Sequence, residues 1–475
     1  MKTMDLIKCM LCLVFILAGI SLSADEPAED AQVSSEDSID TQFGLKLGFG
    51  VQSFPNPDYN GGEAPKTNTY QSIRLAPDLQ IGNFGAGLDL TLNYNFTGDH
   101  NTSDGFTIRQ EDWIPDADQG RGVFDIYLPK IRYVSWGRQG DPLYAAMGTL
   151  SEATLGNGFI MGNYSNALFF PDRRFFGLHL NVDGALFDFP VLGLEYFAGN
   201  LARLDVMGGR LYARPMVYTG VPLLINTQFG VTGLFDRDPY FIARTTPESD
   251  YFGDEPDIVA DPDAFVRIAG LDVRQPILEN PVISLAVFGD VVAQDQSIGS
   301  MVGTGGRLMN ILPFSAQLRF LGANFHPVYF NRTYDLYRVK RYEVYSGAAS
   351  QPGYMGWHVG SGLILMDEAL HFSVSVSGPV GVDAEKGLTP ELEATLTINE
   401  GIIPGLSLNA FYQKESITAV SNVFSFENAV IGTRINYRTG PAVITLLYDV
   451  RYNPYSDSHS PWQVTSGLET TLSLF

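Results

Sequence analysis

The sequence predicts an all-β protein: a transmembrane antiparallel up-and-down β-barrel with an even number of strands, about 18–22. Three observations lead to this prediction. Charged residues make up only 17% of the chain and aromatic residues 12%, whereas about 25% of residues are charged in ordinary soluble domains. Segments that alternate apolar and polar residues recur along the chain, and the connections between them alternate between short and long. After residue 24, no apolar stretch approaches the ~20 residues of a membrane-spanning helix.

The N-terminal residues 1–24 have the pattern of a secretory signal peptide. Two lysines lie in the first eight positions, the run 9–22 is apolar, and small residues follow it. The run is shorter than a spanning helix needs, which favours cleavage over an uncleaved anchor. Cys9 and Cys12, the two cysteines of the chain, both lie in this segment. The mature chain is therefore predicted to fold without disulfides.

Residues 25–41 are predicted to form an acidic, disordered periplasmic tail ahead of a barrel that spans 42–475. Seven acidic residues and no basic residue lie between Asp25 and Asp40, and such a segment buries too little apolar surface to fold alone. Docking to a partner is the alternative for this tail. The net charge of the whole chain is −23, which argues against nucleic acid as a partner.

Twenty segments have the alternation that a barrel strand needs, with apolar residues toward lipid and polar residues toward the lumen. A soluble β-sandwich also alternates, so each segment alone is weak evidence. The predicted strands lie near 42–54, 68–81, 84–97, 121–137, 142–150, 172–182, 185–198, 203–216, 221–235, 264–275, 282–294, 301–309, 313–323, 355–366, 369–379, 389–399, 405–415, 428–438, 441–453 and 462–475.

The connections between the predicted strands decide between a sandwich and a barrel. Tight turns follow even-numbered strands and mostly long loops follow odd-numbered ones, as in a barrel with short turns at one membrane face. Proline at 129 and 313 could remove a pair of strands, and the basic segment 326–346 could add a pair. The tight turns are 82–83, 367–368 and 439–440, and the long loops are 55–67, 98–120, 151–171, 236–263, 324–354 and 416–427.

The chain ends in an alternating strand, LETTLSLF, whose last residue is Phe475. With this ending it resembles the bacterial outer-membrane β-barrels of the porin-like class, which close with a C-terminal aromatic residue. The resemblance covers 42–475 in architecture. It implies the outer membrane of a Gram-negative-type bacterium, with outer-membrane lipid and the barrel assembly machinery as partners and Phe475 as the assembly signal. One departure is that Ser473, Thr471 and Glu469 share the face of Phe475, where that class places apolar residues.

Charged side chains on the polar faces of the predicted strands are candidates for lining a lumen. Opposed rows of charge across a water-filled lumen would orient polar solutes. The alternative is that these charges pair with one another and fill the lumen. The basic candidates are Lys130, Arg132, Arg210, Arg214, Arg319 and Arg434, and the acidic candidates are Asp89, Asp125, Glu391, Glu393 and Asp449.

The loop 151–171 is predicted to fold inward and constrict the lumen. It carries one charged residue and three glycines. An exposed apolar loop of this length would be an adhesive patch on the surface. Packing against neighbouring loops at the surface is the alternative. The constriction candidates are Phe159, Ile160, Met161, Phe169 and Phe170, with Leu168 in the same apolar group.

The acidic loop 236–263 offers weak calcium candidates, Asp254, Asp257 and Asp261. Carboxylates are the hard oxygen ligands that calcium prefers. Their spacing matches no EF-hand, so a solvated acidic loop is favoured, and no metal or cofactor is expected.

Catalytic motifs give little support for an enzyme. His371 and Ser373 lie on one face of a predicted strand, and outer-membrane phospholipase A has a similar His-x-Ser pair. That family continues with Asn-Gly after the serine, whereas this chain has Val-Ser. The phospholipase pair also faces lipid, whereas His371 is expected to face the lumen. The protein is therefore not expected to be an enzyme.

The resulting functional hypothesis is an outer-membrane channel for passive or weakly selective passage of small polar solutes. The alternative is a surface-exposed barrel that serves as a platform for adhesion or partner binding. A barrel esterase or a secretion outlet is less favoured. The sequence identifies neither a substrate nor an oligomeric state.

Overall fold

A computed structural model describes residues 41–56, 65–96, 105–116, 120–245, 263–366, 369–452 and 462–474. The predicted signal peptide, the predicted tail apart from Thr41, the calcium candidates and Phe475 lie outside these residues. None of the helices in the described part is both long enough and apolar enough to cross a membrane.

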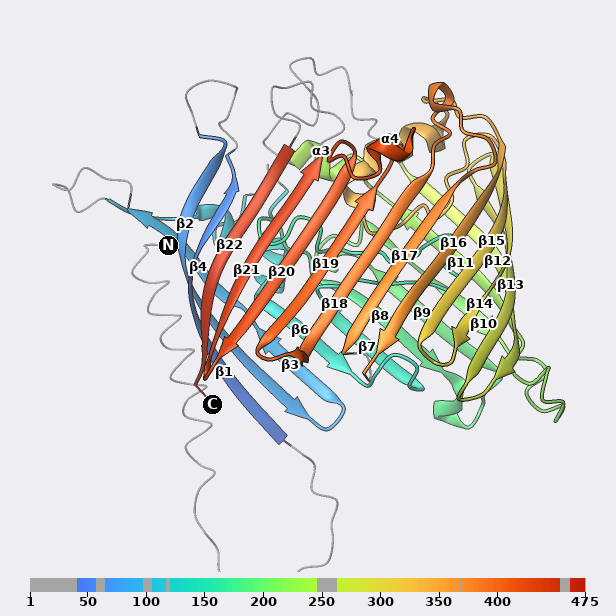
Figure 1. Ribbon diagram of the computed structural model, residues 1–475, viewed down its shortest axis with the longest axis horizontal. Coiled ribbons are helices and arrows are strands. Elements are labelled where there is room, and N and C mark those ends of the chain that lie inside the picture. The colour runs from blue at the N-terminus through green and yellow to red at the C-terminus, as the bar shows by residue number, and fades with distance from the viewer. Residues whose placement is uncertain are drawn as a thin grey trace, which may run out of the picture. The chain divides into compact units, whose positions relative to one another are not determined.

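The described chain forms one antiparallel sheet of 22 strands (Figure 1). In chain order they are β1 (Thr41–Pro55), β2 (Thr67–Ile81), β3 (Phe84–Leu88), β4 (Leu90–Phe96), β5 (Phe106–Ile108), β6 (Ile131–Trp136), β7 (Leu143–Gly148), β8 (Gly177–Asp183), β9 (Leu192–Ala198), β10 (Val206–Ala213), β11 (Gln228–Asp236), β12 (Val266–Glu279), β13 (Ile283–Gln294), β14 (Ser297–Leu308), β15 (Leu312–Leu321), β16 (Tyr354–Leu365), β17 (Leu370–Pro379), β18 (Glu391–Ile403), β19 (Leu406–Lys414), β20 (Ala429–Thr439), β21 (Ala442–Tyr452) and β22 (Trp462–Ser473).

The described helices are short, apart from one. The α-helices are α2 (Val123–Tyr127), α3 (Phe241–Thr245) and α4 (Tyr334–Ser346), and the 3-10 helices are η1 (Gln110–Asp112), η2 (Leu128–Lys130), η3 (Gly184–Phe187), η5 (Ala384–Lys386) and η6 (Val420–Asn422).

The sheet closes on itself, because β1 pairs with both β2 and β22. The closing ladder runs from Lys46 opposite Ser473 to Ser53 opposite Ser466, and Figure 1 shows blue β1 beside red β22. Strands β3 and β4 both pair with β2 and form one wall strand that is interrupted at Asp89, whereas β5 pairs only with β4. The wall therefore has twenty strands, which confirms the predicted even count and closed fold. A closed barrel leaves no strand edge unpaired.

The outer face of the wall is apolar, as a transmembrane barrel requires. Large apolar side chains alternate along the strands and stay exposed, while their neighbours point inward. Examples are Leu211, Val231, Leu271, Val291, Val302, Leu318, Val359 and Leu446. The register of β22 fits this scheme, because Leu468 and Leu474 are exposed whereas Glu469 pairs with Arg74.

The connections separate by length between the two ends of the barrel. Most turns at one end are short, for example 82–83, 404–405 and 440–441, and the other end carries loops such as 149–176 and 322–353. Two connections depart from the rule. The long-loop end has the tight turn 295–296, and the short-turn end has the long connection 214–227.

The predicted strand 121–137 is wrong over its first half, which forms α2 and η2. The Asp125 carboxylate accepts a hydrogen bond from the Gly122 backbone N–H at 3.1 Å and caps the start of α2. Pro129 has no N–H to give to a strand ladder. Paired structure resumes only with β6.

Several further strands start later than predicted, and the largest differences, seven residues each, are at β9 and β11. Residues 185–191 begin with η3, where the Asp183 side chain accepts the Ala185 N–H at 2.8 Å. Residues 221–227 form hydrogen-bonded turns, with the Leu224 N–H donating to the Val221 carbonyl at 2.9 Å. At both places, local hydrogen bonds from a side chain or within a turn therefore replace the hydrogen bonds between strands.

The strand count is the predicted twenty: the two prolines do not remove a pair of strands, and the basic segment does not add one. Pro313 lies at the start of β15, opposite Arg307, where the ladder tolerates it. The segment 326–346, considered as a strand pair, instead contains α4.

The hydrophobic core lies inside the barrel. Two segments between wall strands contribute most of it: the first insert, residues 149–176, and the second insert, residues 322–353, which includes α4. Its buried apolar members include Leu155, Phe159, Met161, Tyr164, Phe325, Phe330 and Tyr334 from the inserts, and Phe197, Leu234, Val266 and Val292 from the wall.

Candidate functional site

The first insert crosses the lumen, because it bonds to wall strands that lie far apart in the sheet. The Gly156 N–H donates to Glu195 Oε2 of β9 at 2.9 Å, and Asn157 Nδ2 donates to Asp290 Oδ2 of β13 at 3.1 Å. Further along, Asn163 Nδ2 reaches Glu393 Oε1 of β18 at 3.5 Å. The loop 151–171 therefore lies within the barrel; its role as a constriction remains a proposal.

The apolar constriction candidates pack mainly against the second insert. The Val328 N–H donates to the Phe159 carbonyl at 2.9 Å, and the Phe330 N–H donates to the Ile160 carbonyl at 3.1 Å. Met161 is fully buried and forms a parallel bridge with Phe330. The two inserts thus hold each other as a small sheet-like unit inside the lumen.

The other two constriction candidates contact arginines of the opposite wall. The Arg451 guanidinium carbon lies 5.1 Å from the Phe169 ring centroid, and that of Arg434 lies 5.3 Å from the Phe170 ring centroid. Cation–π contacts of this kind fix the end of the first insert against β20 and β21.

Buried ion pairs anchor α4 to the wall near β10 and β11. Arg338 donates to Asp236, with Nε 2.6 Å from Oδ2, and to Asp205, with Nη2 2.9 Å from Oδ2. The Tyr164 hydroxyl of the first insert donates to Asp335 Oδ2 at 3.2 Å. Burial raises the pKa of the Asp335 carboxyl to about 7, although the Arg338 charge opposes this. Removing one partner of such a buried network leaves an uncompensated charge.

The inserts do not fill the lumen beside β15–β19. A cavity of about 420 Å³ lies at the long-loop end and a second of about 260 Å³ lies deeper. Arg319, Ser377 and Glu391 line both cavities. We call these two cavities the passage, and the place of their three shared lining residues the meeting point.

Part of the wall beside the passage carries short side chains on its lumen face. Gly360 of β16 lies in the ladder between Ser315 of β15 and Ser375 of β17, and Gly356 and Ser377 share their face. Residues two apart on a strand point to the same side, so one strand can present a row of small groups. Small polar residues keep the space empty of side chains and lined with hydrogen-bonding groups.

Arg319 and Glu391 are the charged groups where the two cavities meet. Arg319 is 3% exposed and donates through Nη2 to Gln317 Oε1 at 2.8 Å. Glu391 accepts the Ser377 hydroxyl at 2.7 Å. Within the described chain, neither side chain forms an ion pair shorter than 4.0 Å. Both were lumen candidates from the sequence.

Most other predicted lumen charges have local partners instead of facing an open lumen. Arg210 is bonded to Glu195 and to Asp272, with 2.7 Å between the nearest atoms in both cases. Asp89 lies 3.0 Å from Arg74 of β2 and 3.0 Å from Arg174 of the first insert. The inserts and the wall therefore neutralise these charges.

The remaining candidates lie at several different places. Arg132 pairs with Asp78, and Arg214 pairs with Asp183 at 2.6 Å at the short-turn end. Glu393 lies 3.4 Å from Arg332 of the second insert. Asp125 caps α2, Asp449 lies on β21, and Lys130 lies 4.0 Å from the Trp113 ring centroid.

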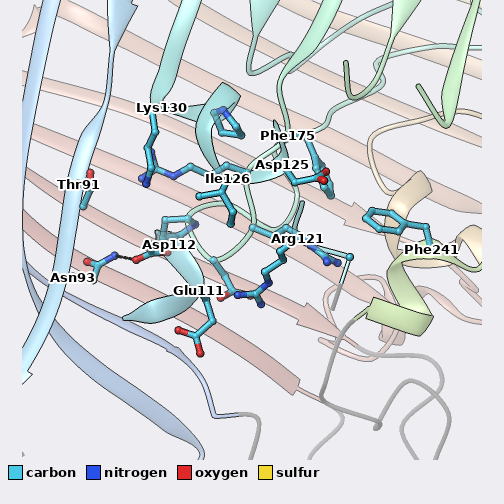
Figure 2. Close-up of a pocket in the computed structure, with 16 residues that line it drawn as sticks. Thr91, Asn93, Glu111, Asp112, Arg121, Asp125, Ile126, Lys130, Phe175 and Phe241 are labelled. Carbon is cyan, nitrogen blue, oxygen red and sulfur yellow. Dashed lines mark hydrogen bonds between the residues drawn. The ribbon is translucent and has the colours of Figure 1, made fainter. Parts of the chain in front are cut away.

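A third cavity, of about 60 Å³, lies where the wall is interrupted between β4 and β6. Figure 2 shows Lys130, Arg121 and Asp112 around it, with Asn93 Nδ2 donating to Asp112 Oδ2 at 2.8 Å. Such a volume has room for only a few water molecules. It is therefore too small to carry solutes in this conformation.

The sequence reasoning missed the second insert as a lumen element. Its charges look like those of a surface segment, yet Arg338, Arg341 and Asp335 are buried. The length of the loop 324–354 and its tyrosines could have indicated that it enters the lumen. The loop 151–171, which was predicted to fold inward, is also long and contains aromatic residues.

The sequence also singled out His371 and Ser373. Both lie on β17, and the Ser373 hydroxyl shares a hydrogen bond with Thr395 at 2.7 Å.

No family model and no curated protein matches this chain. Solved structures are similar only at low identity. OpdO of Pseudomonas aeruginosa is 10% identical, with 92% of this chain and 97% of that chain covered and a TM-score of 0.35. OpdL of the same organism is 10% identical, covering 92% and 99%, with a TM-score of 0.32. OccAB2 of Acinetobacter baumannii is 12% identical, covering 92% and 98%, with a TM-score of 0.32.

These likenesses are too low to carry an argument about activity. The chain's own closed ladder and apolar outer face show the architecture of a transmembrane β-barrel.

Proposed function

We propose that the protein is an outer-membrane channel that admits small polar solutes through the passage beside β15–β19. The single observation that carries the proposal is the pair of cavities that share Arg319, Ser377 and Glu391 as lining residues in a lumen partly filled by the two inserts. The wall at this place offers hydroxyl, imidazole and amide groups, which can replace part of the water shell of a polar solute.

The charges at the meeting point support weak selectivity. Arg319 and Glu391 have opposite charge and no ion-pair partner within 4.0 Å among the described residues, so each can interact with a passing solute. A polar solute between them would be oriented by their field, which is stronger in a narrow, partly desolvated passage than in bulk water.

The proposed location is the outer membrane of a Gram-negative-type bacterium, with the short turns in the periplasm. The closed wall, the apolar outer face and the predicted signal peptide support it. Recognition of Phe475 by the barrel assembly machinery belongs to the same proposal. Deleting Phe475 should lower the amount of assembled protein in the membrane.

Conductance in planar lipid bilayers tests the proposal. The wild-type protein should open small channels, and Ser377→Trp should reduce their conductance severalfold, because the indole would fill the meeting point of the cavities. Ser300→Trp is the matched control: Ser300 lies on β14 opposite Phe320, on the lipid-facing side. It should conduct as the wild type does. A wild-type barrel that assembles but does not conduct would contradict the proposal and favour the adhesion platform.

A further inference from the structure

Two connections at the short-turn end expose an unusual amount of apolar surface. They are residues 184–190, between β8 and β9, and residues 215–225, between β10 and β11; together we call them the apolar rim. Asp188 is their only charged residue. Phe187 is 71% exposed and Tyr218 is 68% exposed. The other exposed large apolar residues of the rim are Leu186, Phe189, Val221 and Leu223.

The two segments of the apolar rim are held in a defined conformation, because hydrogen bonds link them where they join the strands. Arg214 Nη2 donates to both carboxylate oxygens of Asp183, at 2.6 and 2.7 Å, and its Nε donates to the Pro190 carbonyl at 2.8 Å. The Tyr212 hydroxyl also donates to Asp183 at 2.8 Å. The polar groups are thus satisfied inside, while the apolar side chains point to the surroundings.

The wall is short above the apolar rim. Strands β8 and β9 have seven residues each and β10 has eight. At ~3.3 Å per residue and a tilt of ~45°, they rise only about 16–19 Å along the membrane normal, whereas the apolar band of an outer-membrane barrel is ~25 Å tall. Strands β13 and β14, with twelve residues each, reach about 28 Å on the same reckoning. The short strands are β6 to β10, with six to eight residues each, and they include the strands that carry the rim.

The apolar rim is continuous with the lipid-facing side of the wall. The strands that enter and leave it expose outward apolar residues, namely Leu192, Leu194, Leu211, Phe229 and Val231. An apolar patch that extends past the strand ends would be costly in water. It is favourable in the acyl-chain and interfacial region, where tyrosine is also enriched.

We propose that the apolar rim is a lipid-binding surface that lies in the leaflet nearest the short turns and completes the hydrophobic thickness of the wall on its β8–β11 side. Its partner is the acyl chains of that leaflet. A wall shorter than the bilayer otherwise forces the bilayer to thin. The inference does not depend on whether the barrel conducts.

Spin labels on single cysteines test this in lipid vesicles. Cys9 and Cys12, the two cysteines of the sequence, are first replaced by serine. Phe187→Cys and Tyr218→Cys are then labelled with a nitroxide, and Gln139→Cys is the control, since Gln139 is exposed in the polar turn 137–142 at the same end. Collision rates are measured with oxygen, which concentrates in lipid, and with a water-soluble nickel chelate.

Labels at 187 and 218 should collide more with oxygen than with the nickel chelate, and the label at 139 should show the reverse order. Nickel collisions at 187 and 218 that equal those at 139 would place the rim in water and overturn the proposal. Low collision rates with both reagents would also overturn it, because they would mean burial against a second copy of the chain or another protein.

Discussion

The two sides of the lumen use their charges differently. On the side of β9–β12, inward charges are bonded to partners: Arg210 pairs with Glu195 and Asp272, and Asp236 pairs with Arg338 of the second insert. Beside β15–β18, small residues such as Ser315, Gly360 and Ser375 lie on the lumen face. Arg319 and Glu391 are without ion pairs closer than 4.0 Å in the described chain. The ion pairs on the β9–β12 side hold the inserts against the wall. Arg319 and Glu391 have no such partner and can interact with solutes in the passage.

The largest expected effect comes from removing the first insert on the anchored side. Deleting residues 156–170 should raise single-channel conductance severalfold, because the inserts no longer fill the lumen while the wall ladder remains. Heat-modifiable gel migration should show that the barrel still assembles. Failure to assemble would mean that this insert is needed to build the wall, and unchanged conductance would mean that it does not obstruct the lumen.

Arg338→Met should loosen α4 from the wall. It leaves Asp236 and Asp205 buried without their cation, a loss of about 3–5 kcal/mol in the free energy of unfolding. Denaturant unfolding followed by tyrosine fluorescence measures this. The matched control is Arg438→Met, which breaks the exposed pair with Glu400 and should cost only about 0–1 kcal/mol. Equal losses in the two variants would show that the α4 network is not a buried anchor.

On the passage side, charge removal should change selectivity and leave stability almost unaltered. Arg319→Gln should shift the reversal potential in a salt gradient toward cation preference, and Glu391→Gln should shift it toward anion preference, because each leaves the opposite charge alone at the meeting point. Arg438→Gln, in an exposed pair outside the passage, should leave the reversal potential unchanged. Shifts of the same sign for both passage variants would contradict the proposed arrangement.

A further effect concerns the pH dependence of stability on the anchored side. The pKa of Asp335 is raised to about 7 by burial, so the folded state favours the protonated carboxyl. Its stabilising contribution is full below the ordinary carboxyl pKa and is lost as the pH rises through about 7. Stability should thus fall between about pH 4 and 7 by at most ~1.4 kcal/mol per pH unit. Asp335→Asn should flatten this dependence, and an unchanged slope would assign it to other groups.

The wall was predictable from the sequence because barrel strands carry a period of two that survives without tertiary information. Each of the twenty predicted strands corresponds to one wall strand. The errors lie where a local bond competes with the ladder, as at the Asp125 cap of α2 and the Asp183 cap of η3.

The site was predictable only in part. Arg319 and Glu391 were identified as inward charges by their position on alternating strands. Their lack of ion-pair partners was not predictable, since pairing depends on which charges the inserts bring. The burial of α4 was not predictable from its sequence. Charged residues such as Arg338 and Asp335 are typical of a surface helix, and their partners lie on other elements.

Chemical modification during current recording tests the central claim most directly. Ser375 lines the deeper cavity, and Ser375→Cys, with Cys9 and Cys12 replaced by serine, places a thiol there. Adding a bulky thiol reagent to open channels should lower the current in discrete steps, whereas the lipid-facing Ser300→Cys should give no change. Currents that are unaffected in Ser375→Cys, after mass spectrometry has shown that the thiol reacted, would mean that solutes and ions do not cross by this passage.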